Sequence, residues 1–186
     1  GELPNILRGC NASGLMVTHD PEEAMSICDK VAVMNEGKIH QIDTPINLLN
    51  NPKTLFVSSF ILGNNILNLQ KKGNSYVSCL GEINSSGLLN NANIKSMSIS
   101  PKFISIKRSK SSNAIVISKE FLGDYLMYKV SINGDILRVR TNINNKLNNG
   151  EKCSLSINKN SYYFLYPGAY KAVSYTHLRA HETDSY

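Results

Sequence analysis

His19 is the residue of this chain whose type and place in the sequence best suit chemistry. It ends the apolar run GLMVTH, residues 14–19, and an acidic helix start follows it directly. Ligands of open α/β sheets bind at the carboxyl ends of strands. An imidazole there can donate a hydrogen bond to a phosphate oxygen or sense one. The alternative is that His19 only satisfies backbone groups at the end of the strand.

The residues around His19 predict a strand followed at once by a helix. The continuous apolar run GLMVTH is typical of a strand buried on both faces of a parallel sheet. Asp20 suits the N-cap and Pro21 the first helical position, and Glu23 completes a capping box. We expect the helix to run to about Cys28, and its N-terminus to favour negative charge. Capping alone accounts for the acidic residues.

The rest of residues 1–62 predicts a hairpin and two short helices. KVAVM and KIHQI flank the turn NEGK, where Gly37 can take a positive φ. Thr44 and Pro45 then start a helix, and LFVSSFI predicts another.

Residues 66–168 have a different pattern, with many short strands separated by turns. Strand character recurs in YVSCL, SMSIS, FISIK, AIVISKEFL, YLMYKVSI, DILRVRT, KCSLSI and SYYFLY. The Asn-Gly pair in INGDIL is a strong hairpin signal. This pattern predicts a small barrel or sandwich.

Composition excludes several classes of function. No run approaches the roughly 18 apolar residues of a membrane helix. The four cysteines are far apart, which favours reduced thiols over a disulfide frame or a zinc site, and we expect no metal site. The net charge of +6 is spread out, and its one tight basic run, KRSK, has no aromatic residues among it. We therefore expect no nucleic-acid partner.

The stretch MVTHDPEEAMSICDKVAVMNEGKIHQIDTP closely resembles the last part of the nucleotide-binding domain of ABC transporter ATPases. INLLNNPKTLFVSSFILGNN continues the match, as in importer ATPases that carry an extra C-terminal β-domain. The resemblance covers about residues 2–168. It implies ATP and Mg²⁺ as cofactors and a switch role for His19, which would contact the γ-phosphate and couple its state to a dimer interface. It also implies that Asp20 helps to position that loop.

Residues 66–168 resemble the OB-like accessory domain of these importers, the TOBE type. SMSISPKFISIK is similar to its strand–Arg-Pro-Glu–strand element, but reads Ser100-Pro101-Lys102 and lacks the Arg and the Glu. In the family this domain helps two ATPase subunits to dimerise and can receive regulatory signals. The expected fold class is thus the α/β end of a P-loop NTPase domain, residues 1–62, followed by an all-β OB-like domain, residues 66–168.

Most of the ATPase motifs are missing from this sequence. It has no G-x-x-x-x-G-K-[ST] loop, and its one Gly-Lys pair, Gly37-Lys38, lies in the predicted hairpin. The family's Leu-Ser-Gly-Gly-Gln motif, magnesium-binding acidic strand and catalytic glutamate are absent too. We expect a C-terminal fragment that cannot hydrolyse ATP alone, since ATP and Mg²⁺ would be bound mainly by absent residues.

The resemblance also implies an assembly. Intact, the subunit would work as a homodimer under integral membrane permease subunits, at the cytoplasmic face of the inner (plasma) membrane, with a solute-binding protein supplying the cargo. The sequence looks most like ferric-iron importers, and polyamine, sulfate and sugar importers are the alternatives. Two readings of other classes stay open: a stand-alone regulatory or binding β-module without ATPase activity, and an OB protein that binds nucleic acid.

Residues 169–186 fit neither part. VSYTHLRAHETDSY resembles a translated adaptor sequence, so we expect a non-native or disordered tail. His177 and His181 have the spacing of a metal pair on a helix, but no third ligand lies near them in the sequence.

Overall fold

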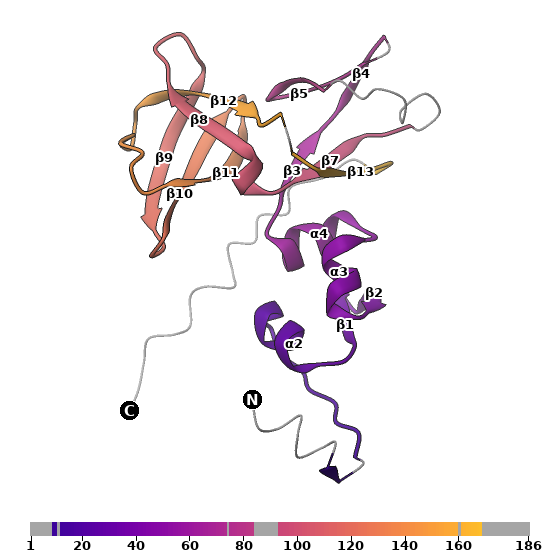
Figure 1. Cartoon of the computed structure of the whole chain (residues 1–186). Coiled ribbons are helices and arrows are strands. Elements are labelled where there is room, and N and C mark those ends of the chain that lie inside the picture. Colours follow the sequence, from indigo (N-terminus) through magenta and orange to yellow (C-terminus); the bar gives the residue numbers. More distant parts are fainter. Residues whose placement is uncertain (1–8, 11, 74, 84–92, 160, 169–186) are drawn as a thin grey trace.

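The structure is a computed structural model, and it describes residues 9–10, 12–73, 75–83, 93–159 and 161–168 (Figure 1). A small helical part with one hairpin comes first along the chain, and an all-β part follows it. This arrangement confirms the predicted fold class, an α/β segment followed by an OB-like β-domain. The tail, with His177 and His181, lies outside the described residues.

The helical part contains the predicted helices and the predicted hairpin. They are α2 (Pro21–Ile27), β1 (Val31–Asn35), β2 (Lys38–Asp43), α3 (Pro45–Asn50) and α4 (Leu55–Leu62). The two residues that join β1 to β2, Glu36 and Gly37, both have positive φ, at 49° and 72°. Positive φ at both central positions is the mark of a type I′ turn, whose twist matches that of a hairpin.

Local capping sets where α3 and α4 begin and end. The Thr44 hydroxyl accepts a hydrogen bond from the Asn47 amide, and the Thr54 hydroxyl accepts one from the Val57 amide. Gly63 ends α4 with a φ of 60°, in the left-handed region that glycine enters at little cost. The two helices and the hairpin then bury a small shared core of Val33, Leu48 and Val57.

The predicted strand GLMVTH does not form. Residues 12–18 take no regular structure, and no strand of the described chain pairs with them. The side chains of Leu15 and Val17 are 96% and 91% exposed. A strand buried on both faces needs a hydrogen-bonded neighbour and covering elements. The prediction was wrong for this structure because nothing in the described chain supplies them, and the segment leads away from α2 (Figure 1).

Three antiparallel sheets make up the β part. The largest has the strand order β11-β10-β9-β12-β8, and the two smaller ones have the orders β13-β7-β3 and β4-β5-β6. The strands are β3 (Asn65–Asn68), β4 (Gln70–Lys72), β5 (Ser75–Ser78), β6 (Gly81–Ile83), β7 (Ser96–Ile99), β8 (Ile104–Arg108), β9 (Ala114–Phe121), β10 (Tyr125–Ile132), β11 (Asp135–Asn142), β12 (Lys152–Ile157) and β13 (Tyr163–Tyr166). One 3₁₀ turn, η1 (Pro101–Phe103), separates β7 from β8.

The five-stranded sheet curls until its two edge strands, β11 and β8, approach each other. Its meander β9-β10-β11 includes the predicted Asn-Gly turn, where Asn133 and Gly134 have φ of 51° and 89°. Tyr128, Val130 and Val139 alternate with more exposed positions and are fully buried inside the curl. Alternation of this kind is what packs one face of an antiparallel sheet onto a core.

A buried polar cluster joins α4 to the β part. The Ser58 and Ser98 hydroxyls hydrogen-bond each other at 2.5 Å, and both are fully buried. The Asn64 side-chain amide donates to Ser98 at 3.0 Å and to Ser58 at 3.3 Å. The Tyr166 hydroxyl donates to the Pro52 carbonyl at 2.9 Å. We propose that the two domains divide here, at residues 63–65, in line with the ranges 1–62 and 66–168.

Stability of the β part should fall in acid, because the pKa of Glu151 is lowered. The Asn148 amide and the Arg108 guanidinium both donate to this carboxyl group. A lowered pKa adds stability that is fully present above the ordinary value of about 4.5 and is lost as the pH falls through the folded value. We expect Glu151→Gln to flatten the pH dependence of the urea midpoint below about pH 5.

Glu82→Gln is the matched control for that measurement, since Glu82 is an exposed carboxyl on β6. Its urea midpoints should follow those of the unchanged chain at every pH. Equal acid sensitivity of the Glu151→Gln chain and the unchanged chain would show that the Glu151 contacts contribute nothing.

Candidate functional site

His19 lies between the extended segment and α2, with its side chain exposed to solvent. Asp20 follows it as the predicted N-cap of α2. The Asp20 carboxyl accepts hydrogen bonds from the amides of Glu22 at 2.8 Å and Glu23 at 3.3 Å. The cap prediction is therefore confirmed, and it fixes the chain direction immediately after His19.

The predicted capping box does not form. In a capping box the third helical residue accepts from the N-cap amide. Here Glu23 accepts instead from the Thr18 hydroxyl, at 2.7 Å, and the Asp20 amide donates to that same hydroxyl, at 3.1 Å. The Thr18 hydroxyl thus lies between the Asp20 amide and the Glu23 carboxyl. It links the residue before His19 to two residues that follow His19.

The N-terminus of α2 does not offer the anion site that the sequence suggested. The helix has seven residues, and the Asp20 carboxyl already takes two of its free amides. Glu22 and Glu23 add further negative charge to the first turn. Nearby carboxylates neutralise the partial positive charge at a helix N-terminus. A phosphate bound here would therefore be contacted by the His19 imidazole and not by the amides of α2.

The His19 ring forms no hydrogen bond within the described part of the chain. The structure therefore gives no support to the alternative that it satisfies backbone groups at a strand end. His40 differs, since its ring lies 3.3 Å from the Thr54 hydroxyl and 4.9 Å from the Phe56 ring. Of the two, His19 is the ring free to meet a ligand.

A cleft of about 470 Å³ separates the helical part from the β part. Its walls include residues of α2, α3 and α4 on one side, and Lys102 and Tyr162 on the other. Pro21, the second residue after His19, lies on this wall. The helix that follows His19 and the β part therefore line the same cleft.

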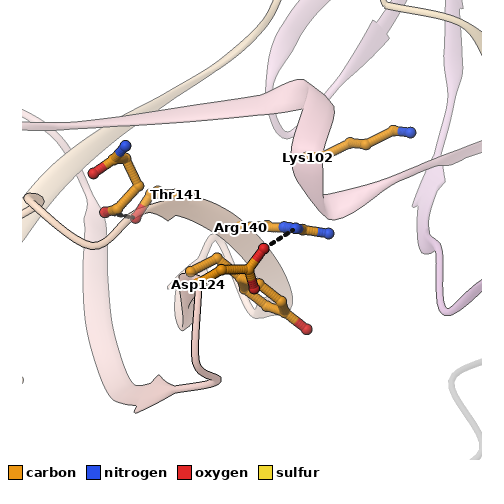
Figure 2. A pocket seen from close by; sticks show the side chains of 6 residues that line it. Lys102, Asp124, Arg140 and Thr141 are labelled. Atoms are coloured by element: carbon orange, nitrogen blue, oxygen red, sulfur yellow. Dashed lines mark hydrogen bonds and ion pairs between the residues drawn. The ribbon is translucent and has the colours of Figure 1, made fainter.

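A second hollow, of about 280 Å³, lies on the β part, and Figure 2 shows the side chains that line it. Lys102 and Arg140 are its cations. The Arg140 guanidinium lies 3.8 Å from the Tyr125 ring centre and 3.5 Å from an Asp124 oxygen. The Lys102 ammonium lies 5.0 Å from the ring centre of Phe103. Sequence reasoning missed this basic and aromatic grouping because its members come from separate segments.

Nucleic acid was not expected as a partner because the basic run KRSK contains no aromatic residues. The fold does bring two cations, Lys102 and Arg140, beside aromatic rings, so that reason does not hold for the folded chain. Both already face rings or a carboxylate of the same fold. A single-strand groove needs basic groups that follow a backbone over several nucleotides. The arrangement thus adds little weight to the nucleic-acid reading.

Other reactive groups of the described residues offer little chemistry. No set of three or more His, Cys, Asp or Glu side chains in this part of the chain could hold a metal ion. Burial, with a smaller effect from Asp135, raises the pKa of the Cys79 thiol to about 12. A thiol with that pKa is a poor nucleophile at neutral pH. Within the described ranges, no helix is long and apolar enough to span a membrane.

Comparisons with known proteins point to import ATPases. The chain is 51% identical over 76 residues to the spermidine/putrescine import ATP-binding protein PotA of Bacillus thuringiensis strain Al Hakam, and to that of Bacillus anthracis. The match covers 41% of this chain and 22% of each relative. The protein of the same name from Trichormus variabilis is 49% identical over 65 residues, which are 35% of this chain and 17% of that protein. No family model matches the chain.

These matches agree with the resemblance to ABC importer ATPases and carry no sign of iron. The matched region is about a fifth of the length of the first relatives. Their names describe polyamine import, which was one of the alternatives to ferric iron. His19 and Asp20 keep the roles that the sequence assigned to them as proposals.

Proposed function

We propose that this chain is the C-terminal part of the ATP-binding subunit of an ABC importer. The observation that carries the proposal is the 51% identity to import ATP-binding proteins over 76 residues. The geometry supports it, because an exposed His19 directly precedes a helix with a firmly held cap. In this proposal His19 contacts the γ-phosphate of ATP, and Asp20 holds the turn that presents it.

We propose polyamines as the imported solutes. The relatives are named for spermidine and putrescine import, and the ferric-iron expectation finds no support among them. The ATPase subunit need not touch the solute, so the weight of this proposal rests on the relatives and on no residue of the site.

ATP and Mg²⁺ would be held mainly by other parts of the complete subunit. The described residues contain no acidic cluster fit for a divalent cation, and the sequence has no phosphate-binding loop. The complete subunit would form a homodimer beneath membrane permease subunits, at the cytoplasmic face of the membrane. A solute-binding protein would deliver the cargo. The β part would contribute to dimer contacts or receive regulatory signals.

The test starts from the DNA on both sides of this reading frame in its source genome. We expect an in-frame upstream sequence that encodes G-x-x-x-x-G-K-[ST], the Leu-Ser-Gly-Gly-Gln motif and the catalytic glutamate. The 186-residue chain alone should then show no Mg²⁺-dependent ATP hydrolysis above background, while the complete subunit should hydrolyse ATP.

Two results would contradict the proposal. The first is a stop codon and an authentic start codon flanking the Gly1 codon, which would leave the stand-alone β-module as the better reading. The second is robust Mg²⁺-dependent turnover by the purified chain, since one histidine without a phosphate cradle supplies almost none of the required charge stabilisation.

A further inference from the structure

We propose that Glu23 is a positioning residue for His19 and acts through the hydroxyl of Thr18. This inference rests on the proposed function, in which His19 contacts the γ-phosphate. Glu23 itself would touch neither nucleotide nor metal. Its role would be to hold the backbone just before His19 in place, as Asp20 holds the backbone just after His19.

The hydrogen bonds form a closed bracket around His19. The Thr18 hydroxyl donates to Glu23 at 2.7 Å and accepts from the Asp20 amide at 3.1 Å. The residue before His19 is thereby fastened both to α2 and to the residue after His19. A hydroxyl that donates to a carboxylate forms one of the stronger hydrogen bonds in proteins. These two hydrogen bonds therefore restrain the backbone on each side of the imidazole.

This bracket does more than cap the helix. The Asp20 carboxyl accepts from the amides of both Glu22 and Glu23, so α2 has its cap without the Glu23 side chain. The Glu23 carboxyl reaches back five residues to Thr18, which lies outside the helix. Loss of this carboxyl should leave α2 folded and free the segment that leads into His19.

Glu22 provides a matched control. It lies in the same turn of α2, has the same side chain and is also exposed. Within the described residues the Glu22 side chain makes no hydrogen bond, and its backbone amide donates to the Asp20 carboxyl. A change at Glu22 alters the charge of the first turn as a change at Glu23 does, but it spares the Thr18 contact.

The test measures steady-state ATP hydrolysis by four variants of the complete subunit, each with a single substitution. We expect Glu23→Ala to lower kcat by about 10-fold, with KM for ATP nearly unchanged, because a misplacement of a reacting group by about 1 Å can cost up to about 100-fold and the Asp20 cap still holds the far end of the turn. Thr18→Val should have the same effect, because valine keeps the shape of threonine and lacks the hydroxyl. Glu23→Gln should recover most of the rate, since its side-chain oxygen still accepts from Thr18. Glu22→Ala should match the unchanged subunit.

A second measurement uses the 186-residue chain and does not depend on activity. Amide hydrogen exchange at Asp20 should speed up in Thr18→Val, because the acceptor of its amide is gone, while exchange within α2 stays unchanged. Equal exchange rates of the Asp20 amide in Thr18→Val and in the unchanged chain would show that the hydrogen bonds around His19 do not form as described.

The outcomes separate this inference from the proposed function. If His19→Ala removes turnover but Glu23→Ala behaves like Glu22→Ala, the positioning role is overturned and the proposed function stands. If His19→Ala leaves turnover unchanged, the proposed function fails at its site. A fall in kcat for Glu23→Ala that Glu23→Gln restores supports the positioning role.

Discussion

Replacing His19 by alanine in the complete ATPase subunit is expected to spare nucleotide binding and to lower ATP hydrolysis by about 100-fold or more. The magnitude follows from the usual contribution of one positioned group to a transition state. Binding should survive because, in the proposed function, the phosphate cradle and the Mg²⁺ ligands belong to other parts of the subunit. His19 is exposed and makes no hydrogen bond within the described part of the chain, so the fold should be undisturbed. Steady-state hydrolysis and equilibrium ATP binding measure the two effects separately.

Lys38→Ala is a suitable control for this experiment. Lys38 is exposed at the start of β2, beside the hairpin turn, and its loss should change neither rate nor affinity. An unchanged rate in His19→Ala would refute the switch role. Loss of ATP binding together with the rate would place His19 in the cradle instead.

Ser98→Val is expected to destabilise the chain by about 2–5 kcal/mol. Ser98 is fully buried at the joint between α4 and β7, where its hydroxyl meets the hydroxyl of Ser58 and the side-chain amide of Asn64. Valine would force extra methyl groups into a packed site, which typically costs about 1–3 kcal/mol. It would also leave the Asn64 amide and the Ser58 hydroxyl with fewer partners in a buried place, at a similar cost.

Urea unfolding of the 186-residue chain measures this effect, with Ser156→Val as the matched control. Ser156 is an exposed strand residue on β12, and valine is well accepted in strands. The control should change stability by no more than about 0.5 kcal/mol. Equal urea midpoints for the two variants would mean that the polar joint does not hold the two parts together.

The elements that were predicted correctly are those with local causes. Thr44 and Thr54 accept from amides three residues on, and the turns at Gly37 and Gly134 need positive φ. Such signals lie within a few residues of the element that they start or end. They could therefore be recognised in the sequence for α2, for the β1–β2 hairpin, for β5 and for β7 to β13, whereas the short strands β3, β4 and β6 were not predicted.

The strand GLMVTH failed for the opposite reason. Its apolar run is typical of a buried strand, but burial on both faces depends on neighbours that no local pattern provides. Leu15 and Val17 consequently stay exposed in this chain. The polar cluster between α4 and β7 could not be predicted for the same reason. Nothing near Asn64 in the sequence indicates that its side-chain amide donates to Ser98, 34 residues further on.

The candidate site divides in the same way. His19 and Asp20 were proposed as site residues from their place between an apolar run and a capped helix. The contact between Thr18 and Glu23 was missed, because a capping box and this bracket share one sequence pattern and differ in side-chain direction. The grouping of Lys102 and Arg140 was missed because η1 and β11 come together only in the folded β part.

The most direct test of the account is a structure of the complete subunit dimer with ATP and Mg²⁺ bound. The account predicts an imidazole nitrogen of His19 within about 3.2 Å of a γ-phosphate oxygen, with the hydrogen bond between Thr18 and Glu23 still in place. A His19 ring that points away from the nucleotide in the closed dimer would contradict it.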